Sequence, residues 1–252
     1  MSVQYNAAGK KYFVPLENNP QVFTKLAHDL GMDPLLEFHD VYSLDDPDLL
    51  AMVPRPAHAL IFITPSNAYH AVEAEDTAAG TRDGPKPAAA TDTEGPHPVL
   101  WFPQTIGNAC GLIALLHSVL NGPSRERIVP GSPLADILRE ALALSSPDSR
   151  AELLYNSAVL EASHSRAAVG GDTAAPDAGD PIGYHFLAFV RGNDGNLWEF
   201  EGSFGGLICR GAVPEGEDML GERVLEAGVR RFIKAGQGSA EFSIIALSER
   251  GQ

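Results

Sequence analysis

The feature that most constrains the fold is a hairpin pattern at residues 185–202. The apolar run HFLAFVR is followed by the polar turn GNDGN and then by LWEFEG. Gly, Asn and Asp favour tight turns, and the flanking runs are rich in residues that prefer strands. The pattern therefore predicts two antiparallel strands joined by a short turn.

Helices are predicted on both sides of this hairpin along the chain. Asn19-Pro20, Ser132-Pro133 and Ser146-Pro147 each place a capping side chain before a proline in the first turn. Apolar residues then recur at helical spacing. The expected helices are 20–30, closed by Gly31; 110–120, closed by Asn121-Gly122; one from 133 with Leu134, Ile137, Leu138, Ala141 and Leu142 on one face; one from 147 through Leu154 towards Leu160; and one from Met219 to Ile233.

Two further apolar runs, HALIFIT (58–64) and FSIIAL (242–247), are predicted to be strands. Mixed helices and strands, with a hairpin towards the C-terminal end, indicate an α+β protein with one core. The chain has 252 residues, 44% of them hydrophobic, which is enough to bury such a core. We therefore expect a single domain over residues 1–252.

Two segments, 71–97 and 163–183, interrupt this pattern. They lack apolar periodicity and are rich in Ala, Gly, Thr, Asp and Pro. Segments of this composition bury little apolar surface. We expect both to be long, mobile loops.

Composition disfavours several classes of protein. The net charge of −15 argues against nucleic-acid binding, which needs clustered Lys and Arg. It permits a basic partner, although acidity that only keeps the chain soluble is the simpler explanation. No apolar run is long enough to span a membrane, and the N-terminus lacks the apolar core of a secretory signal. Two distant cysteines, Cys110 and Cys209, make no disulfide framework, so a reducing, intracellular setting is expected.

Cys110 stands where a polar turn gives way to an apolar helix, in WFPQTIGNACGLIALLHSVLN. With Asn108 as N-cap, Cys110 lies in the first turn, where the helix dipole and unpaired N–H groups favour a thiolate. The same N–H groups, together with the Gln104 side chain, can stabilise an oxyanion. This arrangement is typical of papain-like acyl transfer. A lone cysteine is nevertheless more often a small buried hydrophobe, so catalysis requires a partner base.

The best candidate for that base is His185, one of eight histidines. It begins a strand directly after the second loop, where a side chain can face a cleft and still be held rigidly. His39, beside Asp40, is a weaker candidate. The remaining histidines have no polar residues grouped around them in the sequence: His28, His58, His70, His97, His117 and His164.

The hairpin also supplies an acid. If Arg191 faces Leu197 across the turn, then His185 and Glu201 become diagonal neighbours on one face of the sheet. Glu201 would then orient the imidazole and stabilise its protonated form. Glu199 shares this face but lies further from the base. The alternative for Glu201 is a solvated carboxylate at a strand end.

At this point the chain resembles a known family. QTIGNACGLIALLHSVLN is similar to the active-site signature of the ubiquitin C-terminal hydrolases, which are papain-like cysteine deubiquitinases. Four more blocks follow the family's order: YFVPLENNPQVFTKLAHDLG, EFHDVYSLDDPDLLAMVPRPAHALIFITP, YHFLAFVRGNDGNLWEFEG and SIIALS. The resemblance covers nearly the whole chain. It implies a papain-like fold, with a central antiparallel sheet flanked by helices and a loop, here 163–183, that crosses over the active site.

The resemblance implies roles for four residues. Cys110 matches the nucleophile, His185 the general base and Gln104 the side chain of the oxyanion hole. The orienting acid falls on Glu201, where the family normally has Asp. We expect activity to be retained but lowered, because orienting groups matter less than nucleophile and base. No cofactor or metal is implied.

The implied partner is ubiquitin, whose basic face and Arg-containing tail suit an acidic chain. Leu16, Glu17 and Asp40 match positions that grip this tail, whereas Gln21 stands where the family has an acidic residue. The crossover loop limits leaving groups to small adducts, peptides or unfolded tails. The chain is expected to act as a monomer in the cytoplasm, with the nucleus as a second location.

Alternatives to this function stay open. A hydrolase for a ubiquitin-like modifier would share the same fold and tail. A weakly active ubiquitin-binding pseudoenzyme is suggested only by Glu201. A thiol redox or metal protein is disfavoured, because the two cysteines show neither CxxC nor Cys/His ligand spacing.

Overall fold

The computed structural model describes residues 3–6, 9–81, 99–172, 183–202, 206–239 and 241–251. Its centre is a six-stranded sheet with the order β3-β8-β4-β5-β6-β7, and every neighbouring pair is antiparallel. The strands are β3 (Leu36–Asp40), β4 (Ala57–Pro65), β5 (Tyr184–Arg191), β6 (Asn196–Phe200), β7 (Leu207–Ala212) and β8 (Ser243–Glu249). The α+β class with a central antiparallel sheet is therefore confirmed.

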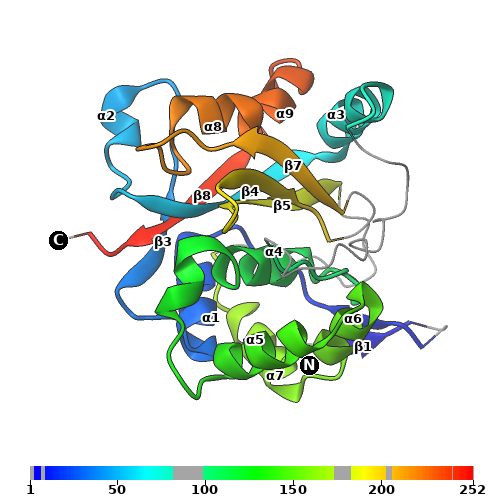
Figure 1. The fold of residues 1–252 in the computed structure, drawn as a ribbon. Coiled ribbons are helices and arrows are strands. Elements are labelled where there is room, and N and C mark those ends of the chain that lie inside the picture. Colours follow the sequence, from blue (N-terminus) through cyan, green and yellow to red (C-terminus); the bar gives the residue numbers. More distant parts are fainter. Residues whose placement is uncertain are drawn as a thin grey trace.

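Helices cover both faces of this sheet (Figure 1). One face carries α1 (Pro20–Leu30), α4 (Cys110–Val119), α5 (Pro133–Ala143), α6 (Pro147–Tyr155) and α7 (Ala158–Ala167). The other carries α2 (Pro47–Leu50), α3 (Ser66–Ala78), α8 (Glu222–Ala227) and α9 (Val229–Ala235). A 3-10 turn, Gly122–Arg127, follows α4, and a small hairpin of β1 (Val3–Tyr5) and β2 (Lys11–Phe13) stands apart from the sheet.

The two faces bury two hydrophobic clusters, and β4 contributes to both. Ala59 and Ile61 pack with α1 and α4, whereas Leu60 and Phe62 pack with α3, α8 and α9. Successive side chains of a strand point to opposite faces, so a strand covered on both sides has a continuous apolar run. This explains why HALIFIT shows no polar alternation.

Helix α4 has no exposed polar face because it lies at the centre of the first cluster. Every residue from Gly111 to Val119 is buried. A helix without a polar face has to be enclosed by other elements. The chain therefore wraps α4 between α1, the sheet and the short turn that follows it, which fixes the position of its first residue, Cys110.

The proline-marked helix starts are confirmed. The side chain of Asn19 accepts the N–H of Gln21 at 2.9 Å, and Ser132 and Ser146 cap α5 and α6 in the same way. Gly31 closes α1 in the left-handed conformation, with φ 107°. Left-handed φ favours glycine, so the stop signal follows from backbone sterics.

The expected loop at 71–97 is partly wrong. Residues 71–78 belong to α3, and 82–98 lie outside the described residues. Ala and Glu dominate AVEAEDTA and both favour helices. The buried apolar residues of this helix are Ala68, Tyr69 and Val72, so most of its apolar face precedes the segment in which periodicity was sought.

The expected loop at 163–183 is also partly wrong. Residues 163–167 complete α7, and 173–182 lie outside the described residues. His164 is buried in this last turn of α7, and its Nε2 lies 2.8 Å from the carbonyl of Val14. A buried histidine in a stretch of small residues gives no apolar periodicity, which is why the helix was missed.

Three helix predictions need correction. The expected helix from Met219 to Ile233 is two helices, because Gly228 breaks it with φ −106° and ψ −107°. Leu160 belongs to α7 rather than to α6, which ends at Tyr155. Leu142 was placed on the buried face of α5 but is 53% exposed, because the helix ends one residue later.

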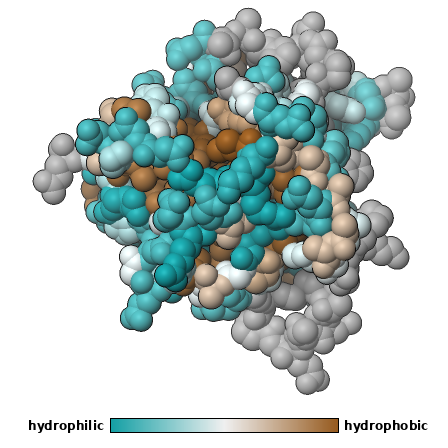
Figure 2. All heavy atoms as spheres, turned by 90° about the horizontal axis from the view of Figure 1, so that it is seen from above, coloured by the Kyte–Doolittle hydropathy of each residue, from teal (hydrophilic) through white to brown (hydrophobic). Residues whose placement is uncertain are grey.

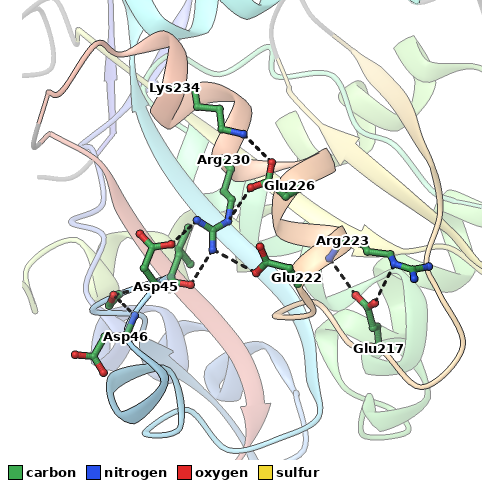
Figure 3. Close-up of polar contacts among 10 residues, drawn as sticks. Asp45, Asp46, Glu217, Glu222, Arg223, Glu226, Arg230 and Lys234 are labelled. Carbon is green, nitrogen blue, oxygen red and sulfur yellow. Dashed lines mark hydrogen bonds and ion pairs between the residues drawn. The ribbon is translucent and has the colours of Figure 1, made fainter.

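Arg230 on α9 forms hydrogen bonds and ion pairs that hold the segment before α2 against α8 and α9 (Figure 3). Its guanidinium donates to the Asp45 carboxylate at 2.5 Å and to the Leu44 carbonyl at 2.9 Å, and it pairs with Glu222 and Glu226.

Figure 2 shows the face over α2, α8 and α9, where hydrophilic side chains surround an apolar hollow. No helix that the structure describes is long and apolar enough to cross a membrane.

Candidate active site

The β5–β6 hairpin brings the predicted base and acid together. Arg191 pairs with Leu197 and Ala188 with Phe200, which is the register expected from the turn. His185 Nδ1 consequently lies 3.8 Å from Glu201 Oε1. The Glu201 side chain is only 5% exposed and that of His185 18%. A buried carboxylate beside an imidazole can orient the ring and stabilise its protonated form.

Cys110 is the first residue of α4, as predicted, but Asn108 does not cap the helix. Asn108 takes the left-handed conformation, with φ 57°, and Ala109 occupies the N-cap position without a side-chain hydrogen bond. Asn tolerates positive φ better than most residues. The Asn-Ala pair therefore turns the chain sharply into the helix.

The thiol of Cys110 is not acidic in this arrangement. Burial raises the pKa of Cys110 to about 11, and the nearby charge of Glu201 adds to the rise. Backbone N–H groups of Gly111 and Cys110 act in the opposite direction, as expected at a helix start, but do not outweigh burial. Cys110 is thus a neutral thiol at pH 7 and needs a base to ionise it.

Gln104 is held against the end of the hairpin. Its backbone N–H donates to the Gly202 carbonyl at 2.6 Å, and the indole of Trp101 donates to the Glu201 carbonyl at 2.9 Å. The segment that carries Gln104 is therefore hydrogen-bonded to the residues that carry the acid. An added Cβ on Gly202 would meet the Ile113 side chain at 2.8 Å, so only glycine fits this close approach to α4.

Two polar residues, His117 in α4 and Asn121 just after it, hydrogen-bond the backbone of residues 100–102, which precede Gln104. Both were missed in the sequence analysis. His117 Nε2 accepts the N–H of Phe102 at 3.0 Å. Asn121 accepts the N–H of Leu100 at 2.6 Å and donates to its carbonyl at 2.9 Å. Buried polar groups in an apolar helix require partners, which is the signal that could have identified them.

A cleft of about 510 Å³ opens at Cys110. Leu16 and Glu17 line it, as the predicted tail contacts should. Ala168 and Gly171 contribute from one end of the expected crossover segment and Tyr184 from the other. The predicted nucleophile and two of the predicted binding residues therefore share one cavity.

Asp40 and Gln21 line a second hollow, of about 820 Å³, between α1 and β3. The two hollows adjoin through Asn19, whose amide lies 3.1 Å from the Asp172 carboxylate and 3.4 Å from that of Glu17. His39, the weaker base candidate, also lines the second hollow, and its Nε2 lies 3.2 Å from the carbonyl of Glu249. It is not part of the Cys110 cleft.

No metal site is found among the described residues, since no three of their His, Cys, Asp or Glu side chains converge suitably. Both cysteines are free thiols: Cys110 is half-buried and Cys209 on β7 is exposed. The thiol of Cys110 stands at a helix start, the Glu201 carboxylate is near enough to raise its pKa, and the His185 imidazole lies beside Glu201. These groups are suited to acyl transfer through a thioester.

Buried histidines should make the protein less stable in mild acid. Burial lowers the pKa of His117 to about 3 and that of His164 to about 4. The unfolded chain binds protons near pH 6.5, so stability falls as the pH drops below that value. At pH 5 the free energy of unfolding should be lower by about 2 kcal/mol for each histidine.

Urea unfolding at pH 7.5 and pH 5 measures this effect. In His164→Phe the fall between the two pH values should be smaller by about 2 kcal/mol. Ile137→Val serves as the matched control, because it removes a methyl group from the buried core but no titratable group, so it should leave the fall unchanged. An equal fall in the parent and in His164→Phe would contradict the argument.

Comparisons with known proteins agree on one family. Residues 13–234 match the family model described as ubiquitin carboxyl-terminal hydrolase, family 1. Ubiquitin carboxyl-terminal hydrolase 3 of Arabidopsis thaliana is 32% identical over 99% of this chain and 100% of its own length. Ubiquitin carboxyl-terminal hydrolase YUH1 of Saccharomyces cerevisiae is 30% identical over 88% of each chain.

A solved structure has the same fold. The catalytic domain of Trichinella spiralis UCH37, crystallised with ubiquitin vinyl methyl ester, superimposes with a TM-score of 0.69 and 22% identity. The match covers 94% of this chain and 95% of that one. The likeness extends across both faces of the sheet.

Proposed function

The chain belongs to ubiquitin carboxyl-terminal hydrolase family 1, and from this we infer that it is a cysteine-type deubiquitinase. It hydrolyses the bond after the C-terminal glycine of ubiquitin. The observation that supports this function is a thiol at the start of α4 that is close to the Glu201 carboxylate, which lies beside His185. There Cys110 opens into a cleft, and the Gln104 segment is hydrogen-bonded to the hairpin end that holds His185 and Glu201.

We propose the following roles for these residues. His185 takes the proton of the Cys110 thiol, whose high pKa makes a base necessary, and the sulfur attacks the glycine carbonyl. The Gln104 side chain and the Cys110 N–H hold the oxyanion. His185 then protonates the leaving amine. Water, activated by His185, hydrolyses the thioester and restores the thiol.

We propose that the ubiquitin tail follows the line of the two hollows. Asp40, Glu37 and Asp29 line the outer one, and Glu17 lies beside Cys110 in the inner one. Carboxylates along such a path attract an arginine-containing tail and speed its encounter. Leu16 lines the inner hollow together with Cys110, and we place the Gly-Gly terminus, which has no side chains to accommodate, beside it.

We also propose that part of the expected crossover loop 163–183, residues 173–182, screens leaving groups by size. The proposal is supported by Gly171 and Tyr184, which lie on either side of these residues and line the cleft at Cys110. Small adducts, peptides and unfolded tails would pass, and folded domains would be retained. A variant with this segment shortened should gain activity on ubiquitin fused to a folded domain relative to a small amide. An unchanged ratio would remove the segment from selectivity.

The first test is hydrolysis of ubiquitin that carries a fluorogenic amide at its C-terminus. The parent protein should release the fluorophore, and the same amide on a free Leu-Arg-Gly-Gly peptide should react far more slowly. Matched substrates built on ubiquitin-like modifiers decide the remaining alternative. Faster turnover of one of these would reassign the substrate while leaving the mechanism intact.

Glu201 gives a specific prediction. Glu201→Gln keeps the size of the side chain but removes its charge, so kcat/KM should fall by about 100-fold. Glu201→Asp should hold or raise activity, because the shorter acid matches the family. A pseudoenzyme is not favoured, since the other catalytic positions are intact. A Gln variant as fast as the parent would exclude Glu201 from the mechanism.

We further propose that the protein works as a monomer in a reducing compartment, the cytoplasm or the nucleus. Its two free thiols support such a setting. Sedimentation of the protein with and without ubiquitin should give a monomer and a 1:1 complex. A dimer in the absence of ubiquitin would contradict this proposal.

A further inference from the structure

The imidazole of His185 stacks on an aromatic ring of α3, a helix on the face of the sheet opposite to α4. The ring centroids of His185 and Tyr69 lie 4.1 Å apart, and the ring planes differ by 12°. Tyr69 comes from α3, which packs against β4 and β5. This face-to-face contact restricts the plane of the imidazole, whereas the 3.8 Å approach of Glu201 concerns only Nδ1.

The stacking ring is itself held in place. Tyr69 is 1% exposed, and Phe232 of α9 lies parallel to it at 6.4 Å and 11°. His70 meets the same imidazole edge-on, at 5.6 Å and 80°, and its Nδ1 lies 3.0 Å from a Glu73 carboxylate oxygen. The imidazole of His185 is therefore bounded on a face and an edge by two consecutive residues of one helix.

The far end of α3 is fixed to the strand that leads to the acid. Asp76 receives two hydrogen bonds from Arg210, at 2.8 and 2.7 Å, and Arg210 donates to Glu199 at 2.8 Å. Glu199 lies two residues before Glu201 on the same chain segment. Helix α3 thus touches His185 at one end and is tied to the strand of Glu201 at the other.

We propose that Tyr69 is a positioning residue for His185. Its ring sets the plane of the imidazole so that Nδ1 faces Glu201 and Nε2 is presented for proton transfer. The proposal rests on the assignment of His185 as the general base. A face-to-face ring contact contributes modestly to stability, but a small misorientation of a base costs rate steeply. Loss of the ring should therefore lower kcat more than it changes KM.

The spectroscopic part of the test needs no substrate. Protons over the face of an aromatic ring resonate upfield, so the ring protons of His185 should show this displacement in the parent. His185→Gln identifies the signals. The displacement should persist in Tyr69→Phe, which keeps the ring, and vanish in Tyr69→Met, which fills the space without one. Absence of the displacement in the folded parent would overturn the stack, whatever the enzymatic result.

The kinetic part uses ubiquitin with a fluorogenic amide. Tyr69→Met should lower kcat about tenfold with KM changed less than about twofold, and Tyr69→Phe should restore kcat to within about twofold of the parent. Phe189→Leu is the matched control, because Phe189 is 1% exposed in the same cluster and its ring contacts are Phe62 and Phe232. It should leave kcat within about twofold of the parent.

The outcomes separate this proposal from the function itself. An inactive parent with an upfield His185 signal would reject the hydrolase and keep the stack. Equal losses of kcat in Tyr69→Met and Phe189→Leu would show that Tyr69 acts only through core packing and would overturn the proposal. If Tyr69→Met does not fold, Tyr69→Phe and the spectrum of the parent still decide it.

Discussion

Cys110→Ala is expected to lose hydrolysis of a ubiquitin C-terminal amide by at least about 10⁴-fold. The alanine variant keeps Gln104, His185 and the cleft but has no nucleophile to form the thioester. Residues that act as a catalytic unit lose most of their effect when any one is removed. In this variant the only remaining reaction is direct attack by water that His185 activates, and this should account for the small rate that is left. Hydrolysis is measured with the fluorogenic ubiquitin amide.

Binding separates loss of chemistry from loss of the site. Cys110→Ala should bind ubiquitin at least as well as the parent, because a methyl group replaces a thiol at the edge of an existing cleft. Cys209→Ala is the matched control, since Cys209 is the exposed thiol on β7 and should leave the rate unchanged. A parent that binds ubiquitin but is as slow as Cys110→Ala would identify a binding protein instead of an enzyme.

The elements that sequence predicted well are those whose signals are local. The hairpin register follows from the number of residues in the turn, and it correctly paired Arg191 with Leu197. The starts of α1, α5 and α6 follow from capping side chains and prolines within three residues of each other. Geometry of this kind depends on backbone sterics and nearby hydrogen bonds, which short stretches of sequence contain.

The errors arise where distant contacts decide the structure. Helix α3 looks like a loop because its apolar contacts are few, yet Asp76 is held by arginines from β7 and α9. Gly228 splits a periodic run into two helices, and glycine suits this position because the Phe189 ring lies 3.2 Å from the place of an added Cβ. Contacts between residues far apart in the chain leave no local sequence pattern.

The candidate site also contains residues that the sequence identifies and residues that only the folded structure reveals. The residues proposed to react, Cys110, His185 and Glu201, could be proposed from the sequence because chemistry limits which residue types can serve. Their supports could not. His117 was set aside because no polar residues are grouped around it in the sequence, although it accepts the N–H of Phe102, and Tyr69 was not considered at all. Such residues act through shape and hydrogen bonding to the reacting groups, which become visible only in the folded chain.

The largest effect on stability is expected from Arg210→Met. The Arg210 side chain is 4% exposed and bonds two buried carboxylates, Asp76 and Glu199, which are 2% and 1% exposed. Removing one partner from a buried ion network leaves charge without compensation and costs about 3–5 kcal/mol. Methionine keeps the volume of the side chain, so the loss reports on charge and hydrogen bonds more than on a cavity.

Urea unfolding at pH 7 measures the loss, and Arg139→Met is the matched control. Arg139 also bonds two carboxylates, Asp136 and Glu140, but it is 68% exposed, so its removal should cost less than about 0.5 kcal/mol. The outcome that contradicts the argument is an equal loss in both variants, which would mean that burial adds nothing to the network.

The effect of Arg210→Met should also depend on pH. Burial alone would raise the pKa of Asp76, but hydrogen bonds from Arg210 and Arg231 outweigh it and lower that pKa. A lowered carboxyl pKa stabilises the fold above the ordinary value near 4 and loses this contribution as the pH falls through the lowered value. The parent should therefore lose more stability than the variant below about pH 4, and the difference between them should narrow. A constant difference from pH 7 to pH 3 would show that Arg210 acts through packing alone.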